Sequence, residues 1–376
     1  MKEKAHIDYF DYVRVIAALC VIYMHTAAGP LRAGINTDWQ FMNLFTSYSF
    51  TAVPLFFMMS GYLILTSKKT ADISVLLKKR LPKLLVPLLG WTVVAVLWNL
   101  YSTHKLTAAA FCYQMVQALH TPAAVHFWYM YALITLYVLS PFLYSALHSL
   151  DNRGHRFLLA LIGLVTLRSV VSDFLPDHFK MFVSIDLIDT LQILSGNLCT
   201  FLLGYYLGST KKHLSNSALL VSVAGLLAVI TIGTWNMTVR TGSFNQTFQS
   251  QSTGLEVLLA ACIFLLFKQN CNKRSRFLAR VPLVPLALPI YMMHNILLDM
   301  VLHIGIAPVT FADTLLFTIA NFVVCFIATK TAATIKPLCY LSSGMRYADA
   351  CESCNWVYTV RWIKAVRAKK RKSPVF

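Results

Sequence analysis

Charged side chains are scarce in this chain, and acidic ones are the scarcest. Charged residues make up 13% of its 376 residues, with 15 Asp and Glu against 33 Lys and Arg, while apolar residues make up 57%. Such a composition, with a mean hydropathy of +0.61, is far from that of a soluble globular domain. We therefore predict a polytopic membrane protein.

Disulfide frameworks, metal motifs and separate catalytic domains are also missing. Most of the nine cysteines lie in apolar runs or in segments expected on the cytoplasmic side, where disulfides are rare. Cys351 and Cys354 form one C-x-x-C pair, and without a second pair at zinc-binding spacing we favour reduced thiols over a zinc or redox site. No metal is expected, and any chemistry must take place among the membrane helices.

Ten apolar runs are candidate membrane helices, several of them short against the roughly 20 residues that span a bilayer. The first run contains Arg14 and His25 and has no cleavage pattern, so we expect it to be retained as a span. The fold class predicted is an all-α transmembrane bundle of about ten spans. The runs cover residues 10–28, 44–66, 84–102, 126–147, 157–172, 190–208, 218–235, 254–267, 286–306 and 311–329.

The basic residues favour one orientation of this bundle. With the N-terminus inside, 27 of the 33 Lys and Arg residues fall in cytoplasmic segments. Both termini are therefore expected to be cytoplasmic. The net charge of +18 needs no nucleic acid partner, because contact with anionic lipid headgroups is sufficient. A phosphate-rich cytosolic ligand would also suit these segments.

No repeat or long linker divides the chain, so we predict one integral membrane domain over residues 1–335 and a basic cytoplasmic tail over 336–376. The stretch 356–372 suits either a helix on the inner membrane surface or a disordered cationic end. Of the outer loops, 173–189 is acidic and 236–253 is rich in hydroxyl and amide side chains. Both compositions fit sugar binding, and both also fit an ordinary solvated loop.

Arg14 and His25 are the most informative residues, because ionisable groups inside a span are costly and mark functional sites. Eleven residues make about three helical turns, which places both on one face about 16 Å apart, with the small residues Ala17 and Val21 between them. We interpret Arg14 as an anchor for an anionic substrate and His25 as a general base. A core histidine bonded to a helix carbonyl is the alternative. Asp11 would hold the guanidinium, or form a simple interfacial ion pair.

Basic residues concentrate at the cytoplasmic start of the third span, in the sequence KKRLPK. The positive-inside rule explains them, and they would also suit phosphate binding. Arg80 is the preferred phosphate ligand, since a guanidinium grips phosphate bidentately, and Lys83 lies beside it.

Aromatic and histidine residues in two further spans are candidates for binding the acceptor. His126 and Trp128 open the fourth span, where an aromatic belt is the ordinary explanation. Tyr291 and His294 share a face near the middle of the ninth span. Glu256, the one glutamate in a span, pairs with a histidine or caps its helix near the outer surface.

These segments resemble the acyltransferase-3 family of integral membrane acyltransferases. The first span matches through Asp11, Arg14, Ala17, Val21 and His25. The other matching segments are FFMMSGYLI, the R-L-P-K stretch ending in Pro87, HFWYM through Pro141, and LPIYMMH.

The resemblance implies transfer of an acyl group, usually acetyl, from cytosolic acyl-CoA to a hydroxyl reached from the outer side. The acceptor would be a surface polysaccharide or a related molecule, and the protein would lie in a bacterial plasma membrane. It implies that His25 is the catalytic histidine, that Arg14 lies along the donor path and that Arg80 lies near the CoA phosphates. Lys83 stands where many relatives carry a second arginine, which keeps the charge and weakens a bidentate contact. A transporter or flippase of an anionic or lipid-linked glycan is the alternative class, and a non-catalytic scaffold is a third.

Overall fold

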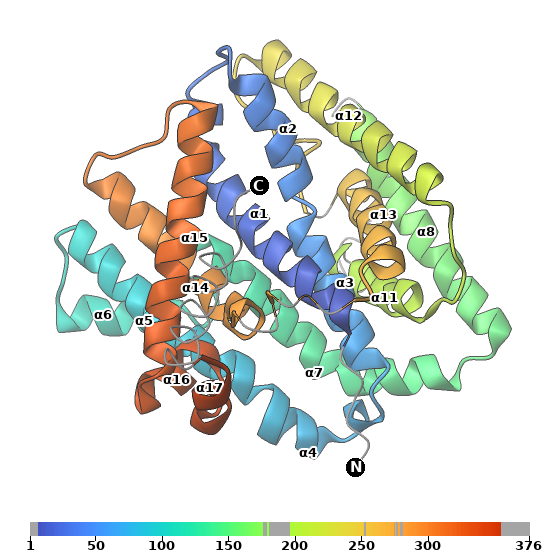
Figure 1. The fold of residues 1–376 in the computed structure, drawn as a ribbon, viewed down its shortest axis with the longest axis horizontal. Coiled ribbons are helices and arrows are strands. Elements are labelled where there is room, and N and C mark those ends of the chain that lie inside the picture. Colours follow the sequence, from blue (N-terminus) through green and yellow to red (C-terminus); the bar gives the residue numbers. More distant parts are fainter. Residues whose placement is uncertain are drawn as a thin grey trace, which may run out of the picture.

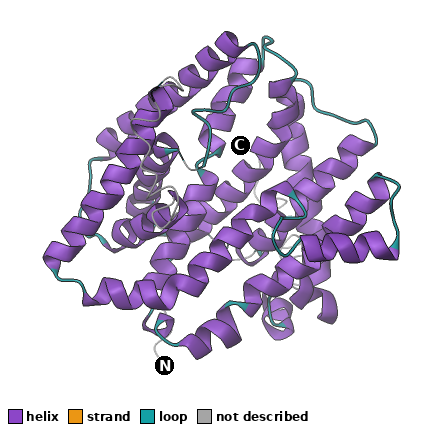
Figure 2. Cartoon of the chain, turned by 180° about the vertical axis from the view of Figure 1, so that it is seen from behind, coloured by secondary structure: helices purple, strands orange, loops and turns teal. Residues whose placement is uncertain are grey.

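The computed structural model describes residues 7–175, 179, 196–251 and 253–354, apart from 274, 276, 279 and 280. Helices dominate this part of the chain, and it contains no strand (Figure 2). Eight helical segments within it are long and apolar enough to cross a membrane. The predicted all-α polytopic fold is confirmed. Most of the acidic loop 173–189 and all of the basic stretch 356–372 lie outside the described residues.

Each of the ten predicted runs overlaps one or two helices. The long helices are α1 (Asp8–Arg32), α2 (Trp39–Ser49), α3 (Ala52–Leu65), α5 (Pro82–Ser102), α7 (Trp128–Ser149), α8 (Asn152–Phe174), α11 (Gly196–Ser209), α12 (Asn216–Thr241), α13 (Gly254–Asn270), α14 (Leu283–His303) and α15 (Phe311–Ala333). The shorter elements are η1 (Lys68–Thr70), α4 (Ile73–Val75), η2 (Leu76–Arg80), α6 (Ala108–Gln117), η3 (Val125–Phe127), α16 (Lys336–Ser343) and α17 (Tyr347–Cys354).

Helix α1 runs through the centre of the molecule (Figure 1), where it packs against α2, α3, α14 and α15. Helix α14 also packs against α5, and α7 packs against α3 and α5. On the opposite side, α8 and α12 lie at the periphery and pack against α13. The helices that carry the predicted site residues Arg14, His25, Tyr291 and His294 are therefore the central ones.

The predicted run 44–66 is not one helix. It divides at Phe50 and Thr51 into α2 and α3, and α3 packs tightly against α11. A side chain at Gly61 would overlap the backbone of Phe201, and one at Gly204 would overlap the backbone of Met58. Small residues let membrane helices approach this closely. The two glycines therefore fix α3, which borders the predicted donor path.

The start of the predicted tail continues the bundle. Helix α16 packs against α5 and α15, and α17 packs against α15 and α16. The indole Nε1 of Trp91 donates a hydrogen bond to the carbonyl oxygen of Ser342 at 2.9 Å. Gly90 lies so close to the carbonyl of Leu341 that a side chain there would collide with it. Residues 336–354 thus cover part of the N-terminal half of α5.

The polar outer loop predicted over 236–253 is partly structural. Helix α12 extends to Thr241, which shortens the loop. Gln249 is buried, and its Nε2 donates to Asn43 Oδ1 at 2.7 Å and to Ser47 Oγ at 2.8 Å. An amide that holds α2 in this way is not available to a sugar.

Candidate active site

Three histidines from three separate elements meet inside the bundle. His25 comes from α1, His126 from η3 at the start of α7, and His294 from the middle of α14. The ring centroids are 5.2 Å apart for His25 and His294, 4.8 Å for His126 and His294, and 6.1 Å for His25 and His126. Residues more than a hundred positions apart in the sequence thus form one polar cluster.

His126 is fixed against α14 by two hydrogen bonds that run in opposite directions. Its ring Nε2 donates to the carbonyl oxygen of Met292 at 3.0 Å. The hydroxyl of Tyr291 donates to the carbonyl oxygen of His126. Because one bond uses the side chain and the other the backbone, both the ring and the chain segment of His126 are held in place.

His294 is held from its own helix and from α15. Its ring Nδ1 donates to the carbonyl oxygen of Tyr291 at 2.5 Å. Its backbone carbonyl accepts a hydrogen bond from Asn321 Nδ2 at 2.9 Å, and Asn321 Oδ1 accepts one from the thiol of Cys325 at 3.1 Å. Asn321 therefore ties α14 to α15 at the level of the histidine cluster.

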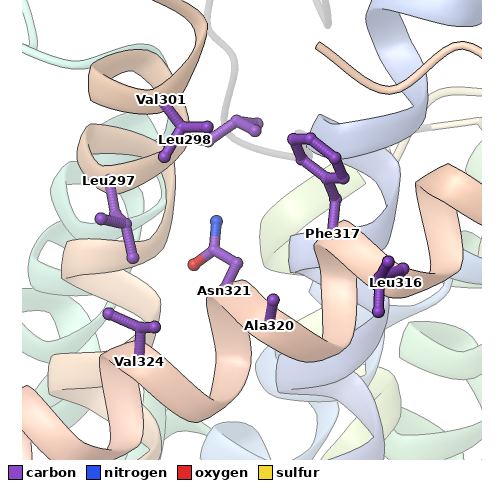
Figure 3. Close-up of a pocket in the computed structure, with 8 residues that line it drawn as sticks. All are labelled: Leu297, Leu298, Val301, Leu316, Phe317, Ala320, Asn321 and Val324. Atoms are coloured by element: carbon purple, nitrogen blue, oxygen red, sulfur yellow. The ribbon is translucent and has the colours of Figure 1, made fainter. Parts of the chain in front are cut away.

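Figure 3 shows Asn321 in a cavity of about 290 Å³ between α14 and α15. Asn321 is the one polar side chain among the eight that line this cavity. The other lining residues are Leu297, Leu298, Val301, Leu316, Phe317, Ala320 and Val324. The cavity is thus an apolar space with a single amide, which is already used to hold His294.

Two ring nitrogens of the cluster have no hydrogen-bond partner within the described residues. His126 Nδ1 and His294 Nε2 are buried without a hydrogen bond, and the two residues are only 2% and 0% exposed. The ring of His25, which is more accessible, also makes no hydrogen bond or ion pair in the described part of the chain. No group of three or more His, Cys, Asp or Glu side chains among the described residues could hold a metal ion.

Arg14 lies towards the N-terminal end of α1 and opens onto a cavity of about 190 Å³. Its Nη1 is 3.7 Å from Asp11 Oδ1, and its side chain is 31% exposed. The cavity lies between α1, α3, α5, α7 and α14, and Tyr291 lines it together with Arg14. The Tyr291 hydroxyl also bonds the backbone of His126, so Tyr291 both lines this cavity and contacts the histidine cluster.

Arg80 lies on η2, a π-helical turn that ends just before Pro82. Single π-helical turns occur often at functional sites. Arg80 Nη1 donates to Thr70 Oγ1 at 2.7 Å. The phenol of Tyr137, on α7, lies within electrostatic range of both Arg80 and Arg14. Tyr137 is therefore near both the cavity at Arg14 and the basic residues Lys78, Lys79, Arg80 and Lys83, which we call the basic mouth.

Lys83 is exposed at the start of α5, next to the turn between α16 and α17. Gly344 in that turn has a φ of 66°, and a side chain there would collide with the carbonyl of Lys83. Hydrogen bonds from Arg346 hold the pKa of Asp349 below its usual value, and the charge of Lys83 acts in the same direction. The turn thus forms one side of the basic mouth.

Two predicted binding residues lie away from the centre of the cluster. Trp128 is half-buried beside Tyr129 in the first turn of α7, two residues after His126. Glu256 lies in the first turn of α13 and is fully buried, with neither carboxylate oxygen hydrogen-bonded within the described residues. Within the described part of the chain, no hydrogen bond or ion pair joins Glu256 to the three histidines.

Sequence reasoning missed Thr70, Tyr137 and Asn321. Asn321 carried a usable signal, because an amide within an apolar span needs a partner on a neighbouring helix. Tyr137 lies in a run that already contains several aromatic residues, so nothing sets it apart. Thr70 lies in a polar connection, and only the fold brings it to Arg80.

The long apolar helices of the bundle thus bury a cluster of polar side chains between them. The acyltransferase-3 family, described as an acyltransferase domain, matches residues 7–330. The chain belongs to this family, as its motifs predict, and the protein is a membrane acyltransferase. No curated protein and no solved structure is significantly similar to it. Helices α16 and α17 lie beyond the residues that the family matches.

Proposed function

We propose that this protein is an O-acetyltransferase of the bacterial plasma membrane. Its donor is cytosolic acetyl-CoA, and its acceptor is a hydroxyl of a surface glycan or another cell-envelope molecule reached from the outer side. The observation that carries the proposal is the position of His25. It lies beside two buried imidazoles and on the same helix as Arg14, which lines a cavity together with Tyr291.

In the proposed reaction His25 takes the proton of the acceptor hydroxyl as its oxygen attacks the thioester carbonyl of the donor. The bond between the carbonyl carbon and sulfur breaks, and the CoA thiolate leaves. His25 then returns the proton to that sulfur, so the products are an acetyl ester and CoA. The imidazole ends the cycle in the neutral state in which it began.

Basic side chains on the cytoplasmic side bind the donor in this proposal. Arg80 and Lys83 contact the phosphates of CoA at the mouth, where Arg80 supplies the bidentate group. Arg14, held by Asp11, binds the donor within the cavity. The phenol of Tyr137 lies within electrostatic range of both guanidinium groups and would face the same ligand.

In this proposal the acceptor binds to Trp128 and to the face of α14 that carries Tyr291. Trp128 lies in the first turn of α7, at the predicted outer entrance. Aromatic faces and imidazole nitrogens together suit a sugar, which offers both apolar C–H groups and hydroxyls.

A transfer assay on purified protein in lipid tests the proposal, with labelled acetyl-CoA and a pool of glycans. His25→Ala should lower label transfer and CoA release by at least about 100-fold, the contribution of a general base. His213→Ala is the matched control, because His213 is an exposed histidine between α11 and α12. Full activity of His25→Ala would refute the base. Movement of intact glycan without CoA release would identify a transporter instead.

A further inference from the structure

The hydrogen bonds of His126 and His294 determine which ring nitrogen of each carries a proton. A carbonyl oxygen only accepts hydrogen bonds, so the nitrogen that bonds it must be an N–H. His126 therefore carries its proton on Nε2, which bonds Met292, and His294 carries its proton on Nδ1, which bonds Tyr291. In the neutral ring the other nitrogen is a bare acceptor.

The cluster thus contains two buried acceptor nitrogens, His126 Nδ1 and His294 Nε2. Neither makes a hydrogen bond within the described residues. Leaving such groups unpaired in a dry interior costs free energy, so a site that keeps two of them is built to receive a donor.

His25 is the donor within reach. A hydrogen bond of about 3 Å between two ring nitrogens places the ring centroids about 5 Å apart. The centroids of His25 and His294 are 5.2 Å apart, whereas those of His25 and His126 are 6.1 Å apart. His294 is therefore the nearer acceptor. His25 has no carboxylate partner among the described residues, so no acid takes the orienting role that an aspartate has in a Ser-His-Asp triad.

We propose that His294 is the positioning residue of this site, and that its Nε2, which has no hydrogen bond in the structure, accepts one from a ring N–H of His25 after a small rotation of either ring. This bond would leave the other ring nitrogen of His25 bare and aimed at the acceptor hydroxyl. This inference rests on the proposed function for its catalytic consequence. The hydrogen bond itself can be measured without any turnover.

The second acceptor gives the cluster a further property. When His25 has taken the acceptor's proton it is an imidazolium with two N–H donors. His294 Nε2 accepts from one of them, and the other N–H holds the proton that returns to the CoA sulfur. The second unpartnered acceptor, His126 Nδ1, lies in the same cluster with its ring centroid 6.1 Å from that of His25, so its dipole also favours the charged state. The two neutral rings therefore stabilise the charged state of His25 in place of a carboxylate, and no atom or electron is lost or gained.

Nitrogen NMR of the full-length protein in lipid, labelled with ¹⁵N-histidine, tests the hydrogen bond directly. His25 is assigned from the spectrum of His25→Gln. In the wild type one N–H of His25 should show the shift of a donor to nitrogen, and this shift should disappear in His294→Leu. His303→Leu is the control, since His303 is exposed at the end of the same helix. A His25 signal that is the same in wild type and His294→Leu overturns the inference.

The kinetic arm separates positioning from folding. His294→Leu should lower kcat at least about tenfold while leaving the donor KM within about twofold, because the donor cavity is unchanged. His294→Gln keeps an acceptor oxygen near the position of Nε2 and should recover part of the loss. Equal losses in both variants, with the His25 signal unchanged, would overturn the positioning role.

Failure of the proposed function gives a different result. If His25→Ala retains full transfer while the His25 N–H shift still depends on His294, the base is wrong and the hydrogen bond stands. If His25→Ala is inactive and the shift is independent of His294, the base stands and the positioning role is wrong.

Discussion

The central helices and the peripheral helices of this protein are built differently. In their most apolar windows, α1 and α14 are 50% buried and the segment of α2 and α3 is 72% buried. The corresponding fractions are 6% for α8 and 17% for α12, which are nevertheless more apolar. Arg14, His25 and His294 all lie on the central helices.

The difference shows what hydrophobicity measures in a membrane protein. A helix that faces lipid must be apolar on most of its surface, whereas a helix inside the bundle can carry polar groups if neighbouring helices satisfy them. The less apolar spans are therefore the better candidates for a site. Here the backbone carbonyls of Met292 and His294 on α14 accept hydrogen bonds from side chains of η3 and α15.

Glycine substitutions should give the largest difference in stability between the central and the peripheral helices. Gly61→Leu places a side chain on the backbone of Phe201, so α3 and α11 must separate, which should cost about 3 kcal/mol or more. Gly163→Leu is the control on α8, where nothing lies within 4 Å of an added Cβ. Its stability should change by no more than about 1 kcal/mol. Thermal unfolding in detergent measures both, and equal melting temperatures would remove the distinction between the regions.

A charge change on a central helix should affect donor use next most strongly. Arg14→Gln removes a charge-assisted contact to the donor, so kcat/KM for acetyl-CoA should fall about 10- to 100-fold, mainly through KM. Arg156→Gln, an exposed arginine on α8, should have no effect. If Arg14→Gln instead prevents membrane insertion and leaves the kinetics of the inserted fraction unchanged, Arg14 is structural.

A substitution at the edge of the central region should have the smallest effect. Arg80→Lys keeps the charge but loses the planar fork and the contact to Thr70, so the donor KM should rise about three- to tenfold. Lys79→Arg, on the same turn but exposed, should leave KM unchanged. A shorter donor that lacks the CoA nucleotide should not distinguish Arg80→Lys from wild type. If Arg80→Lys also raises the KM for that shorter donor, Arg80 does not act through a contact to the CoA phosphates.

Much of the fold was predictable because a span must be long and apolar. The positions of α1, α7 and α15 follow from composition alone. The break at Phe50 and Thr51 was not predictable, because both sides of it are apolar. Helices α16 and α17 were missed since short polar helices depend on tertiary contacts, such as the bond between Trp91 and Ser342.

The site was predictable only within single helices. Helical spacing places Arg14 and His25 on one face of α1, and Tyr291 and His294 on one face of α14. It says nothing about which helices are neighbours, so the meeting of His25 with His126 and His294 required the structure. Likewise no periodicity relates Asn321 to the carbonyl it holds.

Pro289 interrupts the regular bonding of α14 within the stretch that lines the cavity at Arg14, which runs from Val284 to Tyr291. Proline has no N–H, so the carbonyl of Pro285, four residues earlier, lacks its usual helical hydrogen-bond donor. Pro285 itself lines that cavity. The wall of the cavity therefore contains a helical turn with one backbone hydrogen bond missing, which no inventory of the α14 side chains reveals.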